Sequence, residues 1–145
     1  MIAFTVAGKP VPYKRTNGGA HGRYTHPAHR AHATKVATLA RVAHRRRPPL
    51  DGPRLLANAI PVVLECVFVF PRPGPRTMKP GPRVRFLDDP DLSNLLKLVE
   101  DALQDAGVLT NDCRVDGYAG SGRWYAATGE EAHTAVKVWP LVEPG

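Results

Sequence analysis

Three residues in the second half of the chain could together act on a phosphate group. Asp91 precedes an apolar stretch, Lys97 lies within it, and Asp112 follows Asn111 in a turn beyond it. A helix followed by a short loop can fold Asp112 back toward Asp91. Two carboxylates near a lysine suit a hard divalent cation with oxygen ligands and a phosphate whose negative charge needs stabilisation. The pattern therefore predicts a site for a metal ion and a phosphate.

The same residues also allow purely structural interpretations. Asp91 follows a proline ahead of the apolar stretch, where it could cap a helix, and Ser93 could serve the same end. Lys97 and Asp101 have the i,i+4 spacing of a surface ion pair. The residues alone leave both interpretations open.

Residues 92–106 form the clearest predicted helix, and this element must position the polar groups. Its leucines, valine and alanines recur at three and four positions, as on one face of a helix. Gly107 follows where a C-terminal cap residue is expected. Asn94, Lys97 and Asp101 share the polar side of this helix. We therefore expect all three to face the proposed site.

The remaining elements predict a single α+β domain that spans residues 1–145. Four segments alternate or carry β-branched and aromatic runs, and a second helix is expected over residues 27–46. The expected strands span residues 2–7, 62–70, 114–126 and 132–139. We expect one mixed sheet of four or five strands, packed with two main helices.

The charge of the chain favours a polyanionic partner. The formal net charge is +7 and the isoelectric point is near 9.9, which favours electrostatically steered association. Solubility alone is the alternative, but the basic residues cluster, as in nucleic-acid-binding proteins. No apolar run is long enough to span a membrane, and the start lacks the pattern of a secretory signal. We expect a cytosolic protein with no membrane contact.

A proline-rich basic segment covers residues 71–90. It contains six prolines, four arginines and one lysine, a composition that predicts an exposed, mobile loop without regular structure. Its functional interpretation is a flap that orders on binding DNA, and its alternative is a plain linker. Basic residues in this loop and in a glycine-rich N-terminal loop could reach a phosphate backbone. The expected DNA contacts are Lys14, Arg15, Arg23, Arg76 and Lys79.

The central segment has the spacing of a known motif, Asp-x-Asp-Asn-Leu-x-Lys, with another Asp ten residues after the first and a later Asp-Asp pair. The chain reads Asp91-Leu92-Ser93-Asn94-Leu95-Leu96-Lys97, then Asp101, then Asn111-Asp112. Segments 8–15, 23–27 and 136–139 also look like those of the proteins that carry this motif. In all of these the chain resembles the RusA-type Holliday-junction resolvases, and the resemblance covers nearly its whole length.

The resemblance implies a Mg²⁺-dependent endonuclease, with Mn²⁺ able to substitute and no small-molecule cofactor. Such an enzyme acts as a homodimer and resolves four-way and other branched DNA by paired symmetric nicks. The catalytic residues implied are Asp91, Asp112 and Lys97. The metal ligands expected are Asp91, Asp112, Ser93 and Asp89, with Asn94, Asp101 and Asn111 in support.

Two positions depart from the family's motif. Ser93 stands where the family has aspartate, and Asn111 replaces the first aspartate of the later pair. A neutral hydroxyl at position 93 removes one negative charge, which Asp88, Asp89 or Asp116 could supply. Two further hypotheses follow: a junction-binding protein that has lost cleavage on the same scaffold, or a general basic nucleic-acid-binding module whose carboxylates serve only as caps and ion pairs.

Overall fold

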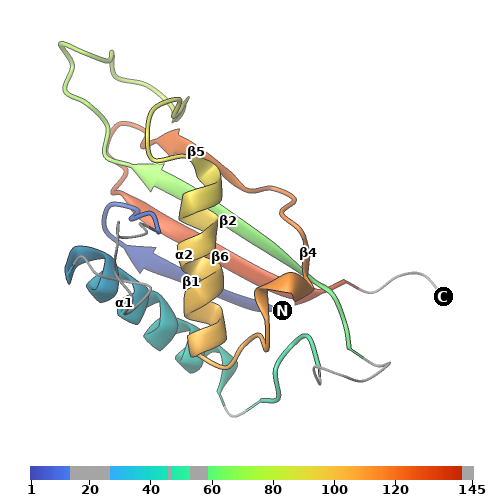
Figure 1. Cartoon of the computed structure of the whole chain (residues 1–145). Helices are drawn as coiled ribbons and strands as arrows, with labels where there is room; N and C mark the ends of the chain where they lie inside the picture. Colours follow the sequence, from blue (N-terminus) through green and yellow to red (C-terminus); the bar gives the residue numbers. More distant parts are fainter. Residues whose placement is uncertain (14–26, 46, 53–58, 142–145) are drawn as a thin grey trace, which may run out of the picture.

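A mixed sheet forms the centre of the computed structural model, and two helices lie on one of its faces (Figure 1). The structure describes residues 1–13, 27–45, 47–52 and 59–141. Within them the strands are β1 (Ile2–Ala7), β2 (Val62–Phe70), β3 (Val84–Arg85), β4 (Val115–Gly117), β5 (Gly122–Tyr125) and β6 (His133–Pro140). The helices are α1 (Pro27–His44) and α2 (Leu92–Asp105), and a short 3₁₀ helix, η1 (Asp112–Arg114), precedes β4.

The sheet has the order β1-β6-β2-β5-β3, and β4 also pairs with β2. The central strand β2 runs antiparallel to β6 and parallel to β4 and β5. The predicted α+β class, the mixed sheet and the two helices are confirmed. The expected count of four or five strands was wrong, because the described residues form six. Both β3 and β4 are too short to carry a periodic pattern that the sequence could reveal.

The segment predicted as one strand from 114 to 126 is divided into η1, β4 and β5. A turn ahead of β5 separates the two strands, and Gly120 in it has a φ of +82°. A Cβ at Gly120 would lie 2.0 Å from Oε1 of Glu65, so only glycine fits there. The Ser121 hydroxyl accepts a hydrogen bond of 2.9 Å from the Cys66 amide of β2. The turn is therefore held against β2 before β5 begins.

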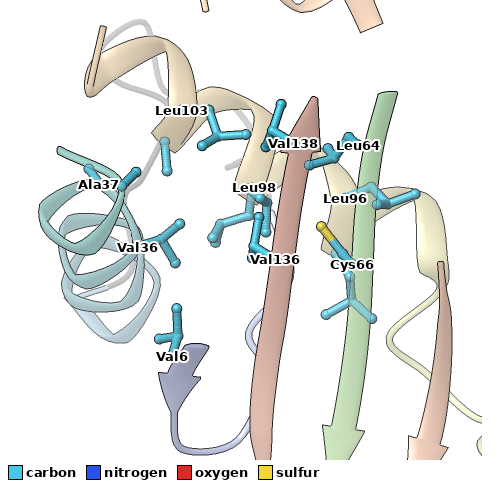
Figure 2. Packing of buried hydrophobic residues seen from close by; sticks show 14 of the residues in the cluster. Val6, Val36, Ala37, Leu64, Cys66, Leu96, Leu98, Leu103, Val136 and Val138 are labelled. Atoms are coloured by element: carbon cyan, nitrogen blue, oxygen red, sulfur yellow. The ribbon is translucent and has the colours of Figure 1, made fainter. Parts of the chain in front are cut away.

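The hydrophobic core lies between the sheet and the helices (Figure 2). Leu64 and Cys66 of β2, with Val136 and Val138 of β6, point toward the helices. Val36 of α1 and Leu98 and Leu103 of α2 fill the space from the other side. Side chains alternate along a strand, so the intervening residues of β2 and β6 lie on the face that neither helix covers.

Helix α2 begins and ends close to its predicted bounds. After Asp105 the chain turns through Gly107, whose φ is +75°, and the Val108 amide donates to the Leu103 carbonyl at 3.0 Å. This is the expected glycine C-cap. None of the described helices is long and apolar enough to cross a membrane.

The proline-rich segment differs from its prediction at one point. Val84 and Arg85 form β3, which pairs antiparallel with Tyr125 and Trp124 of β5, so the segment is not wholly irregular. Its expected mobility stays a prediction, as does the homodimer. The expected DNA contacts Lys14, Arg15 and Arg23 lie outside the described residues.

Candidate active site

The entry into α2 is fixed by hydrogen bonds from β5. The Arg123 guanidinium donates to the carbonyls of Asp88 at 2.7 Å and Pro90 at 3.0 Å. The Tyr125 hydroxyl donates to the Asp88 carboxylate at 2.9 Å. These bonds place Asp91 at the start of α2, at the end of the molecule where the proline-rich segment joins the helix (Figure 1).

The Asp91 carboxylate is exposed and does not cap the helix. Asp91 is the N-cap residue by position, but its side chain makes no capping hydrogen bond. Instead it accepts one of 3.0 Å from the Ser93 hydroxyl. This bond, followed by one from the Asn94 side chain, lowers the pKa of Asp91 below its ordinary value. Both Asp91 and Ser93 therefore present oxygen atoms to solvent, and neither serves the capping role that the sequence also allowed.

Lys97 lies over an aromatic ring from the N-terminal segment. Its ammonium is 5.1 Å from the centroid of the Tyr13 ring, within the range of a cation–π interaction. The Tyr13 amide donates to the Asn94 carbonyl at 2.9 Å, which ties the N-terminal segment to the first turn of α2. Lys97 is exposed, so its charge is available to an anion.

A cleft of about 480 Å³ runs along this side of α2. It is lined by Leu92, Ser93, Leu96, Lys97, Glu100 and Tyr118. Ser93, Lys97 and Glu100 are spaced by four and three residues and therefore share one face of the helix. The structure brings together polar groups from α2 and from the turn after β4 in one depression.

Glu100 is a carboxylate that the sequence prediction did not include. It is buried, and it accepts a hydrogen bond of 2.6 Å from the Tyr118 hydroxyl. Burial raises the pKa of Glu100 most, and the negative charges of Asp112 and Asp101 raise it further, against the opposing bond from Tyr118. The helical spacing from Ser93 and Lys97 was the signal that could have identified it.

Asp112 lies beside the third turn of α2, where Glu100 is. It begins η1, which contacts α2, and its charge acts on both Glu100 and Tyr118. Asp91, in contrast, is at the start of the helix. The convergence of Asp91 and Asp112 on one cation stays a prediction. Within the described ranges, no group of three or more His, Cys, Asp or Glu side chains is placed to hold a metal ion.

Asp51 holds the loop that leads to Asp112, and nothing in the sequence pattern identified it. Its carboxylate is fully buried and accepts hydrogen bonds from the Thr110 amide at 2.9 and 3.1 Å and from the Thr110 hydroxyl at 2.6 Å. It also accepts a longer bond of 3.4 Å from the Asn111 amide. The backbone amides of Thr110 and Asn111 are thereby fixed from a distant part of the chain.

The comparison with protein-family models matches the endodeoxyribonuclease RusA family over residues 4–138. The chain belongs to this RusA family. None of the curated proteins compared with it matches. Membership of this family identifies the chain as a nuclease of the Holliday-junction resolvase type, a class that acts in DNA recombination. This agrees with the resemblance in its sequence motifs.

The other predicted site residues of this RusA-family chain differ in their surroundings. Asp101 is buried, whereas Asn94 and Lys97 are exposed. The supporting role expected of Asp101 stays a prediction. Its charge acts on Glu100, which lines the cleft, and α1 and η1 both contact α2. Asp89 is exposed next to Asp88.

The donor atoms fit a hard cation such as Mg²⁺. Mg²⁺ prefers oxygen ligands, keeps several waters, and in proteins is commonly bound through one or two carboxylates together with phosphates of the substrate. The exposed Asp91 carboxylate, with the Ser93 hydroxyl 3.0 Å from it, is a donor pair of this kind. A cage of three protein ligands is not required for such binding.

Proposed function

We propose that this RusA-family protein is a Mg²⁺-dependent endonuclease that cuts four-way and other branched DNA. The observation that carries the proposal is the exposed, non-capping Asp91 carboxylate, which accepts a hydrogen bond from Ser93. Ser93 and Lys97 line one cleft. Family membership supports the DNA substrate.

Asp91 and Asp112, with Ser93 and Asp89, are the residues that would hold the cation. When bound, the ion would supply Lewis acidity to the scissile phosphate. Lys97 contributes a positive charge that offsets the negative charge developing on the phosphate oxygens. The Tyr13 ring limits the positions of the Lys97 ammonium through the contact of 5.1 Å.

A homodimer is part of this proposal, because resolution of a four-way junction requires two matched cuts. Both helices cover one face of the sheet, which leaves the other face available (Figure 1). That face carries Trp124, Trp139 and Val67, all half-buried in the single chain. We propose that a second copy of the chain packs there.

A synthetic four-way junction tests the proposed activity. Purified protein with Mg²⁺ should produce paired, symmetric nicks near the branch point, and a linear duplex of the same sequence should remain intact. A junction that stays uncut at saturating protein and Mg²⁺ or Mn²⁺ contradicts the proposed enzyme. Equal affinity for junction and linear duplex at matched salt would instead support a general nucleic-acid-binding module.

Position 93 supports a second candidate function, a junction-binding protein with weakened cleavage. Ser93 is neutral, and its hydroxyl donates to Asp91 rather than adding a charge. Ser93→Asp returns the carboxylate of the family motif. If the enzyme is limited by this position, the substitution raises the cleavage rate and lowers the half-saturating Mg²⁺ concentration several-fold. Tight binding without cleavage in both forms favours the junction-binding protein.

A further inference from the structure

We propose that residues 71–83, here called the arm, form a preformed phosphate-binding element in which Arg72 positions Arg76 and Lys79. The proposal rests on the proposed function, because it takes DNA as the partner. In Figure 1 the arm is part of the segment between β2 and α2, which projects beyond the end of the sheet beside the start of α2. A DNA strand at the cleft would therefore lie within reach of it.

Arg72 stabilises the arm through hydrogen bonds to three backbone carbonyls. Its guanidinium donates to the carbonyl of Pro82 at 2.8 Å and to that of Ala126 at 3.0 Å. It also donates to the carbonyl of Lys79. The planar fork of an arginine can serve several acceptors at once, which a lysine ammonium does with much less directional constraint. One side chain thus joins both halves of the arm to the strand end after β5.

Two further links attach the arm to the turn between β5 and β6. Gly81 and Thr128 form a reciprocal pair: the Gly81 amide donates to the Thr128 hydroxyl at 2.8 Å, and the Thr128 amide donates to the Gly81 carbonyl at 3.0 Å. Arg83 donates to both carboxylate oxygens of Glu130, at 2.9 and 3.1 Å from Nε. The Glu130 carboxylate in turn accepts from the Ala127 amide at 3.0 Å.

The tip of the arm also has internal structure. The amides of Thr77 and Met78 both donate to the Gly74 carbonyl, at 2.9 and 3.0 Å, so the tip is a closed turn. The arm folds around a hollow of about 120 Å³ that Arg72, Met78 and Thr128 help to line. A plain linker would have no such hydrogen bonds. These bonds argue that the arm is ordered before it meets a partner, in place of the order-on-binding expected from composition.

The cations of the segment divide into two groups. Arg72 and Arg83 are used within the protein, and the guanidinium of Arg85 lies 4.3 Å from the Trp124 ring centroid. Arg76 and Lys79 are exposed, and in the part of the chain that the structure describes no side-chain hydrogen bond or ion pair engages their charges. The arm thus presents two free positive charges on a fixed backbone. DNA phosphates fit this arrangement, because such contacts need charge and position without a base-specific donor pattern.

A preformed arm increases affinity because the ordering cost is met before binding. Each phosphate contact releases condensed counterions, so the slope of log K against log salt measures the number of contacts. Arg72 itself need not touch DNA. Its effect on binding passes through Arg76 and Lys79, which makes it a positioning residue.

The test compares charge-conserving substitutions at two arginines. Arg72→Lys keeps the charge but loses the fork. Arg41→Lys is the matched control, because Arg41 of α1 likewise donates to a backbone carbonyl, that of Asp105 in α2, at 3.1 Å. For a four-way junction titrated at several salt concentrations, we expect Arg72→Lys to weaken binding about tenfold and to reduce the salt slope by about 1 to 2. Arg41→Lys should match wild type. A wild-type affinity and slope for Arg72→Lys overturn the proposal.

A coupling measurement separates positioning from general destabilisation. In a background of Arg76→Ala with Lys79→Ala, the added Arg72→Lys should cause no further loss of affinity, because its targets are gone. A full additional loss would show that Arg72 acts through some other part of the protein, and would contradict the proposal. Thermal unfolding of each variant records whether the fold itself has been weakened.

Hydrogen exchange tests the arm without DNA. In the free protein the amides of Thr77, Met78, Gly81 and Thr128 should exchange much more slowly than in an unfolded chain, and Arg72→Lys should accelerate them. Unprotected amides in the wild-type protein overturn the preformed arm even if the junction is bound and cut. Conversely, if the amides are protected but the protein binds no DNA, the proposed function is contradicted, whereas the ordered structure of the arm is supported.

Discussion

Asp91 and Lys97 keep their charges accessible, although one directly precedes α2 and the other lies within it. The Asp91 carboxylate accepts from Ser93 and is not used as a cap, and the Lys97 ammonium rests over Tyr13. A charge held near one position loses little freedom when a phosphate arrives, and this is how fixed charges stabilise a transition state.

Substitution of Lys97 should reduce cleavage far more than binding. Lys97→Met removes the charge near the phosphate, so the cleavage rate of a bound four-way junction should fall about 100-fold or more, while the dissociation constant changes little. Single-turnover cleavage and a binding titration measure the two quantities. Lys35→Met is the control, because Lys35 is an exposed lysine on α1 that donates to the Ala7 carbonyl. Equal losses in affinity and rate would assign Lys97 to binding.

The sequence could identify Asp91 and Lys97 because a helical period and a motif spacing place them on one element. Glu100 was within reach of the same reasoning, through its spacing from Lys97. Asp51 was not, because its partner Thr110 is remote in the chain and an isolated aspartate after two prolines has no pattern. Contacts between distant segments leave no local periodicity to read.

At the scale of elements, the loop from α2 to η1 is held by one buried carboxylate. Asp51 is fully buried, and its acceptors are all directed at Thr110 and Asn111. The loop that they fix carries Asp112. The position of a predicted catalytic residue therefore depends on a side chain that does not line the cleft.

Asp51→Asn should both destabilise the fold and slow cleavage. The amide nitrogen of asparagine would face N–H donors, and hydrogen bonds to a charged acceptor contribute about 1.5–3 kcal/mol each. We expect the free energy of unfolding to fall by about 2 kcal/mol, measured by urea denaturation, with a lower cleavage rate well below the unfolding midpoint. Glu131→Gln, at an exposed position ahead of β6, is the matched control. An unchanged rate would show that Asp112 does not depend on this loop.

Helix α1 should make stability sensitive to acid through His32. Burial, and after it the charges of Lys35 and His29, lowers the pKa of His32 from 6.5 to about 4. The folded state thus binds fewer protons than the unfolded state between these values, and stability falls as the pH drops from 6.5 toward 4. His32→Gln should flatten the plot of stability against pH between pH 6.5 and 4, relative to wild type. Above pH 7 the difference in stability between the variant and wild type should not change with pH. Melting temperatures across this range measure it, and parallel curves would contradict it.

Long elements were predictable and short ones were not. The apolar run of β2 and the helical period of α2 span enough residues to show their type. The two residues of β3 and three of β4 are strands only because β5 and β2 supply hydrogen-bonding partners. Gly120 ended the predicted strand at 114–126 for a reason visible only in the fold, the approach of Glu65.

At the scale of the whole molecule, the sheet has one covered and one uncovered face. Leu64, Cys66 and Phe68 contribute to the core under the helices, so by alternation Glu65 and Val67 lie on the other side. On that side Glu65 is 3.8 Å from Lys137 in an ion pair. An apolar face with a central polar pair has the composition of a protein interface.

A charge placed on the uncovered face should dissociate the proposed homodimer. Val67→Arg would bury a guanidinium against a second sheet without a partner, a cost that a stable interface of about 800 Å² per chain cannot easily absorb. Val42→Arg is the control, since Val42 is 54% exposed on α1 and away from the uncovered face. Sedimentation velocity at several concentrations should give a dimer for wild type and Val42→Arg and a monomer for Val67→Arg, with unchanged circular dichroism. A dimeric Val67→Arg would move the interface elsewhere. A monomeric wild type would contradict the homodimer itself, and paired cuts on one junction would then require two independent encounters.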